Sequence, residues 1–282
     1  MYQPDLLKDR VILITGGGTG LGRSMALRFA ELGAKLFLAG RREPPLQKTA
    51  DEICASGGHA AYASCDVRDA AAVERLMDAA ETEFGHVDTL INNAAGNFIA
   101  RTEKLSANAF NSVVSIVLNG TFYCTNALAR RWIAARTGGN VLNIVTTYAS
   151  CGSGSGFVVP SACAKAGVLA MTRSLAVEWA RYNIRLNAIA PGPFPTEGAW
   201  SRLMPTPEFE THARDAHPMK RFGRHEELTN LAVYLLSPLA EYVNGECVTI
   251  DGALWLRGAG EFNDLLQIPD AIWELMEKSR QS

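Results

Sequence analysis

Short apolar runs of strand length alternate with longer segments of helix-like apolar spacing along most of the chain. The first such pair is the run at residues 11–14 and the segment that follows it as far as Leu32. The last apolar run lies at residues 246–252. Strands that alternate with helices predict an α/β fold, a doubly wound Rossmann-type domain whose mostly seven-stranded parallel sheet is flanked by helices. In such a fold, ligands gather at the carboxyl ends of the strands.

The remaining predicted elements follow one another without a break that would separate two domains. Predicted strands lie at residues 35–39, 60–65, 86–91, 141–146 and 184–189, and predicted helices lie at 70–84, 106–136 and 226–236. A further predicted helix carries Ser161 and Lys165 and continues through residues 166–179. Ser106 is a suitable N-cap for the longest helix, which is interrupted near Asn119 and Gly120. We therefore expect one domain over residues 1–282, with a substrate-covering insertion at about 198–219 and a C-terminal tail at about 257–282.

The composition permits a substantial core and excludes several classes of protein. Of the 282 residues, 48% are hydrophobic and 20% are charged, and the formal net charge is −2. These values exclude a disordered chain and a strongly basic nucleic-acid binder. The six cysteines form no CxxC pair and the five histidines lack metal-ligand spacing, so we expect free thiols and no metal site.

Targeting and membrane signals are missing from the pattern. The first ten residues contain no apolar core of a signal peptide, and no later stretch reaches the roughly 18 apolar residues of a membrane span. The last three residues do not match the Ser-Lys-Leu peroxisomal address. We therefore expect a cytoplasmic protein that is not inserted in a membrane.

A glycine-rich turn joins the first predicted strand to the helix after it. Gly16, Gly20 and Gly22 follow the strand directly. Glycines at these positions would let the backbone approach a pyrophosphate and let the helix lie close to the strand, while the helix N-terminus would face the phosphates. The strand and helix on either side favour nucleotide binding over the alternative, a tight turn without a ligand.

The end of the second predicted strand indicates which nucleotide would bind. Gly40, Arg41 and Arg42 stand where NAD-binding folds often carry an acidic residue for the ribose. Two guanidinium groups instead suit the 2′-phosphate of NADP, because their planar donors match phosphate oxygens. The alternative is a solvated basic turn in which Glu43 reaches the ribose. The sequence therefore predicts NADPH/NADP+ as the cofactor.

Residues 141–165 run from an apolar strand through a glycine and serine loop into a helix. Ser161 and Lys165 are four residues apart and project from the same face of that helix, so both can meet one ligand. Tyr148 lies 13 residues before Ser161, where a short loop could return it to the same place. A phenol, with an ordinary pKa of about 10, is a far better proton donor near pH 7 than a serine hydroxyl. We therefore assign the acidic hydroxyl to Tyr148.

Together these motifs resemble the short-chain dehydrogenase/reductase family, and within it the mitochondrial-type 2,4-dienoyl-CoA reductases. The likeness covers nearly the whole chain and is carried by residues 92–98, 118–121, 147–149, 154–161, 164–168 and 260–265. The wider family usually places serine at the first catalytic position and tyrosine at the second, whereas here Tyr148 comes first and Ser161 second. Its Asn-Asn-Ala-Gly motif also has an extra alanine in this chain.

The resemblance implies roles for individual residues. It assigns the acidic hydroxyl to Tyr148, the partner donor to Asn97, and supporting roles to Ser161 and Lys165. Asn119 stands where the family has a structural or proton-relay asparagine, and the family also suggests a homotetramer. CoA contacts would fall on Arg68, Phe98, Ser106 and Arg202. Cofactor contacts would fall on Gly16, Thr19, Gly20, Leu21, Arg41, Arg42, Asp66, Asn93, Lys165, Pro191, Gly192 and Phe194.

The implied reaction is the NADPH-dependent reduction of a 2,4-dienoyl-CoA to a trans-3-enoyl-CoA in the oxidation of unsaturated fatty acids. Hydride would reach C5, Tyr148 and Asn97 would stabilise the dienolate oxygen, and a proton would return to Cα. A 2-enoyl-CoA reductase and a 3-oxoacyl or alcohol dehydrogenase are the alternatives, together with a nucleotide-binding regulator that has no chemistry. Acyl chain length, double-bond geometry and oligomeric state stay open.

Overall fold

The computed structural model describes residues 2–149, 154–196, 200, 206–258, 263, 269–272 and 278. Within them, seven strands form one sheet in the order β3-β2-β1-β4-β5-β6-β7, and every neighbouring pair is parallel. The strands are β1 Val11–Thr15, β2 Lys35–Gly40, β3 His59–Ser64, β4 Thr89–Asn92, β5 Gly139–Ile144, β6 Ile184–Pro191 and β7 Cys247–Ile250. The predicted α/β fold with a doubly wound parallel sheet is confirmed.

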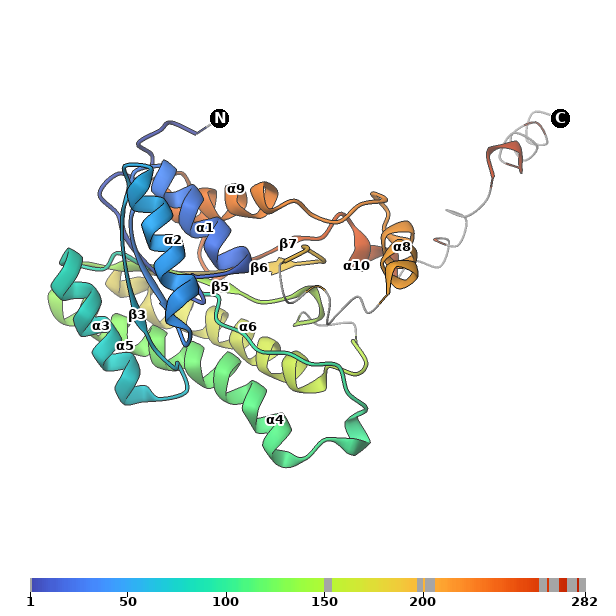
Figure 1. The fold of residues 1–282 in the computed structure, drawn as a ribbon, viewed down its shortest axis with the longest axis horizontal. Coiled ribbons are helices and arrows are strands. Elements are labelled where there is room, and N and C mark those ends of the chain that lie inside the picture. Colours follow the sequence, from blue (N-terminus) through green and yellow to red (C-terminus); the bar gives the residue numbers. More distant parts are fainter. Residues whose placement is uncertain are drawn as a thin grey trace.

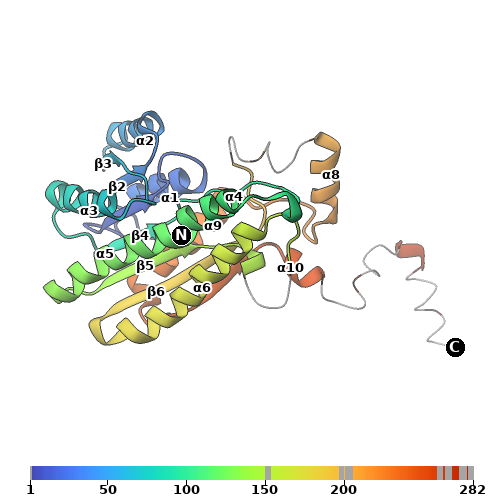
Figure 2. The same ribbon diagram turned by 90° about the horizontal axis from the view of Figure 1, so that it is seen from below.

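Helices cover both faces of the sheet (Figure 1). The described residues contain the helices α1 Gly20–Glu31, α2 Glu43–Ala55, α3 Ala70–Phe84, α4 Ala107–Val114, α5 Gly120–Ala135, α6 Val159–Trp179, α8 Pro207–Ala216, α9 His225–Leu236 and the short α10 Leu254–Arg257. One face carries α1, α2 and α9, and the other carries α3, α5 and α6. Figure 2 looks onto the layer that contains α5 and α6. The central strands are therefore buried between two layers of helices.

Alternate residues of the central strands face the two helix layers. In β1, Ile12 and Ile14 pack with residues of α1, α2 and α9, whereas Val11 and Leu13 pack with residues of α3, α5 and α6. A strand that is buried on both faces needs a continuous apolar run and shows no polar alternation. This is why short apolar runs in the sequence mark the central strands so closely.

Most predicted boundaries agree with the structure within a few residues, and one helix was missed. The predicted helix that carries Ser161 and Lys165 and continues through residues 166–179 is α6, which begins at Val159 because Pro160 suits the first turn of a helix. Ser161 and Lys165 therefore both lie on this helix, as their assignment to one helical face requires. α2 was not predicted, since its two early prolines obscure the helical pattern although they are tolerated in a first turn.

The predicted insertion at 198–219 contains the helix α8. This helix is capped by Thr206, whose hydroxyl accepts a hydrogen bond from the Phe209 amide at 3.2 Å. Residues 198, 199 and 201–205 of the insertion lie outside the described part of the chain, as does most of the predicted tail at 257–282. The covering role of the insertion and the single-domain organisation stay predictions.

α4 and α5 form one continuous helix through a π-helical turn at Ser115–Asn119. The predicted N-cap is confirmed, since the Ser106 hydroxyl accepts a hydrogen bond from the Ala109 amide at 3.1 Å. The predicted interruption near Asn119 is a wider helical turn and not a break. The helix thus continues across the position at which its pattern weakens.

This continuous helix, residues 107–135, is 29 residues long and apolar enough to cross a membrane by length and composition alone. Half of its most apolar 18-residue stretch is buried inside the fold. There Cys124, Leu128 and Trp132 belong to the same core cluster as Leu90 of β4 and Val141 of β5. The core layer beneath the sheet therefore accounts for the apolar character of the helix.

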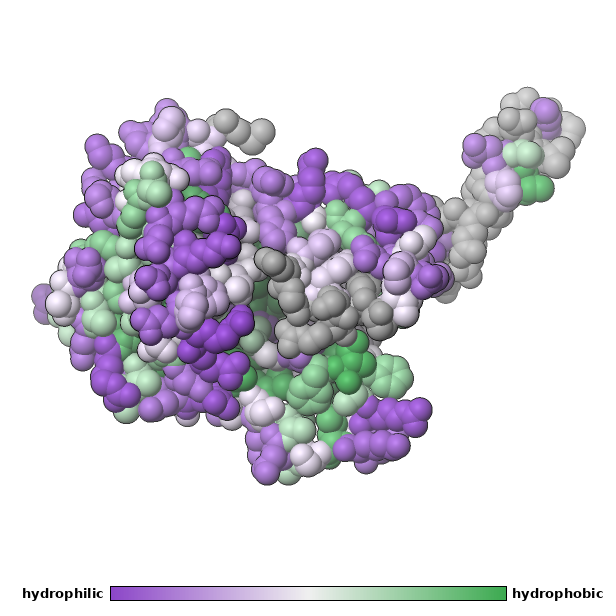
Figure 3. Space-filling model, viewed as in Figure 1, coloured by the Kyte–Doolittle hydropathy of each residue, from purple (hydrophilic) through white to green (hydrophobic). Residues whose placement is uncertain are grey.

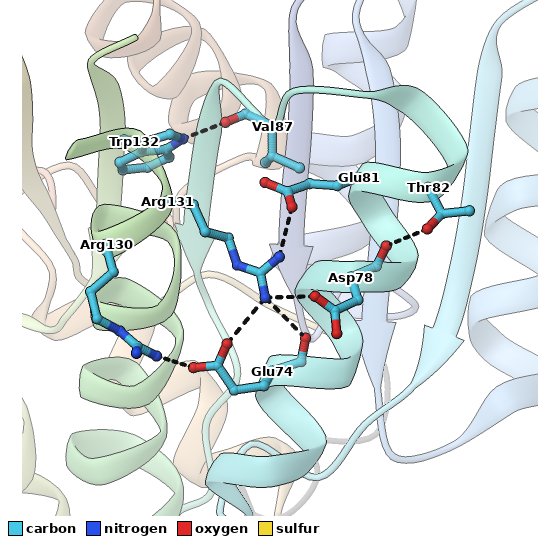
Figure 4. Close-up of polar contacts among 8 residues, drawn as sticks. All are labelled: Glu74, Asp78, Glu81, Thr82, Val87, Arg130, Arg131 and Trp132. Carbon is cyan, nitrogen blue, oxygen red and sulfur yellow. Dashed lines mark hydrogen bonds and ion pairs between the residues drawn. The ribbon is translucent and has the colours of Figure 1, made fainter. Parts of the chain in front are cut away.

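An ion-pair network joins α5 to α3 (Figure 4). The Arg131 guanidinium on α5 lies 2.7 Å from Asp78 and 2.6 Å from Glu81 on α3. It also lies 3.1 Å from Glu74, which pairs with Arg130 as well. One planar guanidinium with several donors can serve three carboxylates at once. The network therefore fixes α3 on α5, and with it the loop that leads from β3 into α3.

Candidate active site

The turn from β1 into α1 has the close packing that its glycine spacing predicts. Gly16 and Gly20 have φ angles of +68° and +54°, in the left-handed region that favours glycine. A side chain at Gly22 would place its Cβ 2.2 Å from the Gly16 carbonyl oxygen. Thr19 is the N-cap of α1 and Leu21 lies in its first turn. The turn thus presents the N-terminus of α1 without bulky side chains, in the manner of a phosphate site.

The loop after β4 is hydrogen-bonded to this turn. The Thr15 hydroxyl accepts hydrogen bonds from the amides of Asn93 at 3.0 Å and Ala94 at 3.1 Å. The Asn93 side-chain amide donates to the carbonyl oxygens of Thr15 at 3.1 Å and Gly16 at 3.2 Å. Asn93, a predicted cofactor contact, therefore directs its donors at the glycine turn and holds it in place. Thr15 was not singled out from the sequence, where its only signal is a hydroxyl at the end of a buried strand.

A cavity of about 460 Å³ opens beside these two loops at the carboxyl ends of β1 to β4. It is lined by Gly16, Gly18, Thr19, Gly40, Arg41, Arg42, Pro45, Leu46, Cys65, Asp66, Val67, Ala94, Ala95 and Ile116. In a doubly wound sheet, nucleotides bind at this point, where the strand order reverses. Five of the predicted cofactor contacts are thus brought to one cavity. Pro45 and Leu46 also line it and were not predicted, because no pattern marks them.

Asp66 and Arg68 form an ion pair at this cavity. Arg68 Nε lies 2.9 Å from Asp66 Oδ1, and Arg68 Nη2 lies 2.5 Å from Asp66 Oδ2. Hydrogen bonding from Arg68, and to a smaller extent the charge of Arg41, hold the pKa of the Asp66 carboxyl below its usual value despite burial. The sequence assigned Asp66 to the cofactor and Arg68 to CoA, and the structure pairs them with each other. Arg41 and Arg42 are exposed at the cavity edge.

Three predicted catalytic residues meet beyond the end of β5. Tyr148 lies on the short 3-10 turn Thr147–Ala149, and Ser161 lies on the first turn of α6. The Tyr148 hydroxyl is 3.1 Å from the Ser161 hydroxyl, and the Asn97 amide nitrogen is 3.5 Å from the Tyr148 hydroxyl. Asn97 comes from the β4–α4 loop. Side chains from three separate segments therefore converge on one phenolic oxygen.

Lys165 is buried one helical turn after Ser161. Its side chain is 8% exposed, and its ammonium group donates a hydrogen bond to the carbonyl oxygen of Ile144, the last residue of β5. Burial lowers the pKa of this ammonium group to about 8. The group is mostly charged at pH 7, and a small change in its surroundings is enough to alter its charge.

The loop that carries Asn97 continues into an exposed apolar surface. Ile99 is 54% exposed, and Phe157, in the loop before α6, is 60% exposed. The Ala100 amide donates a hydrogen bond to the Phe157 carbonyl oxygen at 2.9 Å, which joins the two loops. Figure 3 shows apolar surface gathered beside the start of α4, where these loops lie.

The residues predicted to contact CoA lie in different settings. Phe98 packs against the core cluster formed by residues of α4 and α6, and the Ser106 hydroxyl is used as the N-cap of α4. Arg68 is paired with Asp66, and Arg202 lies outside the described residues. Each described member thus has an intramolecular partner, and its contact with CoA stays a prediction.

The segment after Pro191 was also predicted to contact the cofactor. The Gly192 amide donates to the Ile250 carbonyl oxygen at 3.0 Å, which ties the segment to β7. Phe194 is 8% exposed and belongs to the core cluster beneath α1 and α9. Its ring therefore stabilises the fold, and its contact with a cofactor stays a prediction.

Known proteins resemble this chain in sequence and in structure. A family model described as enoyl-(acyl carrier protein) reductase matches residues 16–254. A probable (2E)-enoyl-CoA-producing 2,4-dienoyl-CoA reductase of Bacillus subtilis (strain 168) is 45% identical over 252 residues, which cover 89% of this chain and 98% of the relative. A probable (3E)-enoyl-CoA-producing 2,4-dienoyl-CoA reductase of Caenorhabditis elegans is 44% identical over 250 residues, 87% of this chain and 80% of the relative. The crystal structure of a short chain dehydrogenase from Bacillus anthracis superposes with a TM-score of 0.80 at 44% identity and covers 88% of this chain and 97% of that one.

Proposed function

Because the chain belongs to the short-chain dehydrogenase/reductase family of nicotinamide-dependent oxidoreductases, we propose that it is an NADPH-dependent 2,4-dienoyl-CoA reductase. The observation that carries the proposal is the meeting of Asn97 and Ser161 at the Tyr148 hydroxyl. Ordinary carbonyl reductases of the family usually have tyrosine at the position of Ser161. The exchanged order of tyrosine and serine supports the dienoyl-CoA group instead.

The residues around the glycine turn fit a nicotinamide dinucleotide. The open N-terminus of α1 suits the pyrophosphate, and the cavity at the switch point of the sheet suits the adenosine half. Arg41 and Arg42 at the cavity edge suit a 2′-phosphate. The bound cofactor would supply a hydride to the substrate. Lys165, Pro191 and Gly192 would hold its nicotinamide half near Tyr148.

The side chains of the site would stabilise charge that develops on the substrate. Addition of hydride at C5 moves the electron pairs of the two conjugated double bonds towards the thioester oxygen. Tyr148 and Asn97 would both donate hydrogen bonds to that oxygen, and one preorganised donor of this kind is worth about 3–4 kcal/mol. Ser161 orients the Tyr148 hydroxyl at 3.1 Å. The charge of Lys165 would favour proton donation from Tyr148.

The position of the final proton decides the product. In the dienolate, C2 and C4 both carry electron density, so protonation at C2 gives a 3-enoyl product and protonation at C4 gives a 2-enoyl product. The Bacillus subtilis relative is named for the 2E product and the Caenorhabditis elegans relative for the 3E product. We favour the 3E product, because Tyr148 and Asn97 would bind the thioester oxygen, which is nearer along the substrate to C2 than to C4.

A panel of substrates tests the proposed function. NADPH oxidation is measured with a 2,4-dienoyl-CoA, a 2-enoyl-CoA and a 3-oxoacyl-CoA of one chain length, and the dienoyl thioester is expected to give the highest kcat/KM. NMR of the product then locates the remaining double bond. Faster turnover of the 3-oxoacyl-CoA would identify a carbonyl reductase, and NADPH binding without any turnover would identify a nucleotide-binding regulator.

Cofactor preference is expected to depend on Arg41. The variant Arg41→Ala should reduce the preference for NADPH over NADH about 10–100-fold, because a hydrogen bond to a charged group contributes about 1.5–3 kcal/mol. The ratio of kcat/KM for the two cofactors measures this effect. Arg75→Ala, which removes an exposed arginine of α3, is the control and should leave the ratio unchanged. A wild-type enzyme that prefers NADH would contradict the assignment.

The proposed partner is an acyl-CoA thioester, and the names of the dienoyl-CoA reductases among the relatives support that class of substrate. The homotetramer and the cytoplasmic location expected from the sequence stay predictions. Neither changes the chemistry assigned to the site, because the catalytic side chains described above all come from one chain.

A further inference from the structure

His225, the first residue of α9, connects three segments around the glycine turn. Its Nε2 atom lies 2.7 Å from the Pro195 carbonyl oxygen, and its Nδ1 atom lies 2.7 Å from the Ser24 hydroxyl. Ser24 is on α1, and its hydroxyl is also 3.2 Å from the Gly20 carbonyl oxygen. One imidazole ring therefore joins α9 both to α1 and to the segment after β6.

The partners of the ring define the role of each nitrogen. A carbonyl oxygen only accepts hydrogen bonds, so Nε2 carries a hydrogen and donates it to Pro195. In the neutral ring Nδ1 is then an acceptor, and the Ser24 hydroxyl donates to it. Ser24 has one hydrogen to give, and the shorter distance favours His225 over Gly20 as its acceptor.

The N-terminus of α9, which carries this ring, is held by a helix cap and an ion pair. The Glu227 carboxylate accepts a hydrogen bond from the Arg224 amide at 2.8 Å, which caps the helix. Arg221 forms a two-point ion pair with the same carboxylate, at 2.7 and 2.9 Å. Such bidentate pairs hold geometry as well as charge. The cap and the ion pair therefore both fix the helix end that carries His225.

The segment that His225 holds lies directly against the glycine turn. The Thr196 methyl carbon is 3.3 Å from the position that a side chain at Gly20 would take. The hydrogen bond from His225 to Pro195 thus sets how closely the segment approaches the turn. The cavity assigned to the adenosine half is lined by other residues and does not include this segment.

We infer that His225 is a positioning residue for the nicotinamide half of the cofactor. Its ring fixes the segment 191–196 against α1, beside the place proposed for the nicotinamide and its ribose. The inference rests on the proposed placement of the nicotinamide beside Pro191 and Gly192. It predicts that loss of the ring weakens binding of the complete cofactor and spares binding of its adenosine half.

Titrations without any acyl substrate test this role. The Kd values of NADPH and NADH are measured by fluorescence, and that of adenosine 2′,5′-bisphosphate by calorimetry. His225→Ala is expected to raise the Kd of whichever dinucleotide the wild type binds more tightly about tenfold, which corresponds to one lost hydrogen bond of this class. The Kd of the bisphosphate is expected to stay within about twofold. A failure of the dienoyl-CoA assignment would not change these titrations.

Two amide substitutions separate positioning from general support of the fold. His225→Gln can place an amide donor where Nε2 lies and is expected to bring the dinucleotide Kd back to within about threefold of the wild type. His225→Asn reaches only the Nδ1 position and is expected to bind as poorly as His225→Ala. Ser24→Ala removes the secondary contact, so a rise of only about twofold to threefold is expected.

Three results would overturn the inference. The first is an unchanged dinucleotide Kd in His225→Ala. The second is an equal loss of affinity for the dinucleotide and for the adenosine bisphosphate, which is what a general loosening of the fold would produce. The third is rescue by His225→Asn as complete as rescue by His225→Gln, since the bond to Pro195 would then have no special part.

Discussion

Replacing Tyr148 with phenylalanine is expected to lower kcat with a 2,4-dienoyl-CoA about 10²–10³-fold, because the variant lacks one preorganised donor to the dienolate oxygen. The Kd of NADPH should change little, since the phenyl ring keeps the shape of the side chain. A loss that falls on kcat and kcat/KM equally identifies a contact made only in the transition state. Steady-state kinetics and a cofactor titration on the same preparation measure both quantities.

The matched control for this variant is Ser161→Ala. The two hydroxyls are 3.1 Å apart, so the serine orients the phenol but is too weak an acid to supply the proton. Its removal is therefore expected to cost about tenfold in kcat, as for one lost hydrogen bond. If Ser161→Ala were inactive while Tyr148→Phe kept a near-normal kcat, the exchanged catalytic order and the proposed reaction would both be wrong.

Features with a local cause could be predicted from the sequence. Gly16 and Gly20 adopt left-handed backbone angles, and β1 is apolar from Val11 to Ile14 because both of its faces are buried. The cap at Ser106 needs only the amide three residues later. In these cases the interacting groups are close in the chain or follow a regular period, so residue spacing carries the information.

Side-chain partners that depend on packing could not be predicted. The bonds from His225 to Ser24 and Pro195 span 201 and 30 positions of the chain. No periodicity relates such positions, and they meet because α9 packs beside α1 on the same face of the sheet. The sequence therefore predicts the glycine turn of the cofactor site better than the side-chain contacts that hold the segments around it.

Lys165 is the residue at which stability and activity are expected to conflict. Burial lowers the pKa of its ammonium group from 10.5 to about 8, so burying the charge costs about 3 kcal/mol at pH 7. Lys165→Met removes that cost and also removes the hydrogen bond to Ile144, which is worth about 1 kcal/mol. The variant without cofactor is therefore expected to be more stable than the wild type by about 2 kcal/mol at pH 7.

The sign of the pH dependence follows from the two pKa values. Between about pH 8 and pH 10.5 the unfolded lysine binds more protons than the folded one, so the stability of the wild type rises with pH in this window. The advantage of Lys165→Met is fully present below pH 8, and above about pH 10.5 the variant should be the less stable protein by the roughly 1 kcal/mol of the lost hydrogen bond. Urea unfolding of both proteins at pH 7 and pH 10 measures the difference, in which the other titrating groups cancel.

The same substitution is expected to lower kcat/KM for the dienoyl-CoA at least about 10³-fold, because loss of assistance to proton transfer typically costs 10²–10⁴-fold. The proposed contact of Lys165 with the nicotinamide half of the cofactor is lost as well. A variant with higher stability and very low kcat/KM would show that the charge of Lys165 serves catalysis and destabilises the folded protein. The opposite pair of results, a less stable protein at pH 7 with near-normal turnover, would mean that the ammonium group serves only the hydrogen bond to Ile144. That outcome would also remove the charge invoked to assist Tyr148.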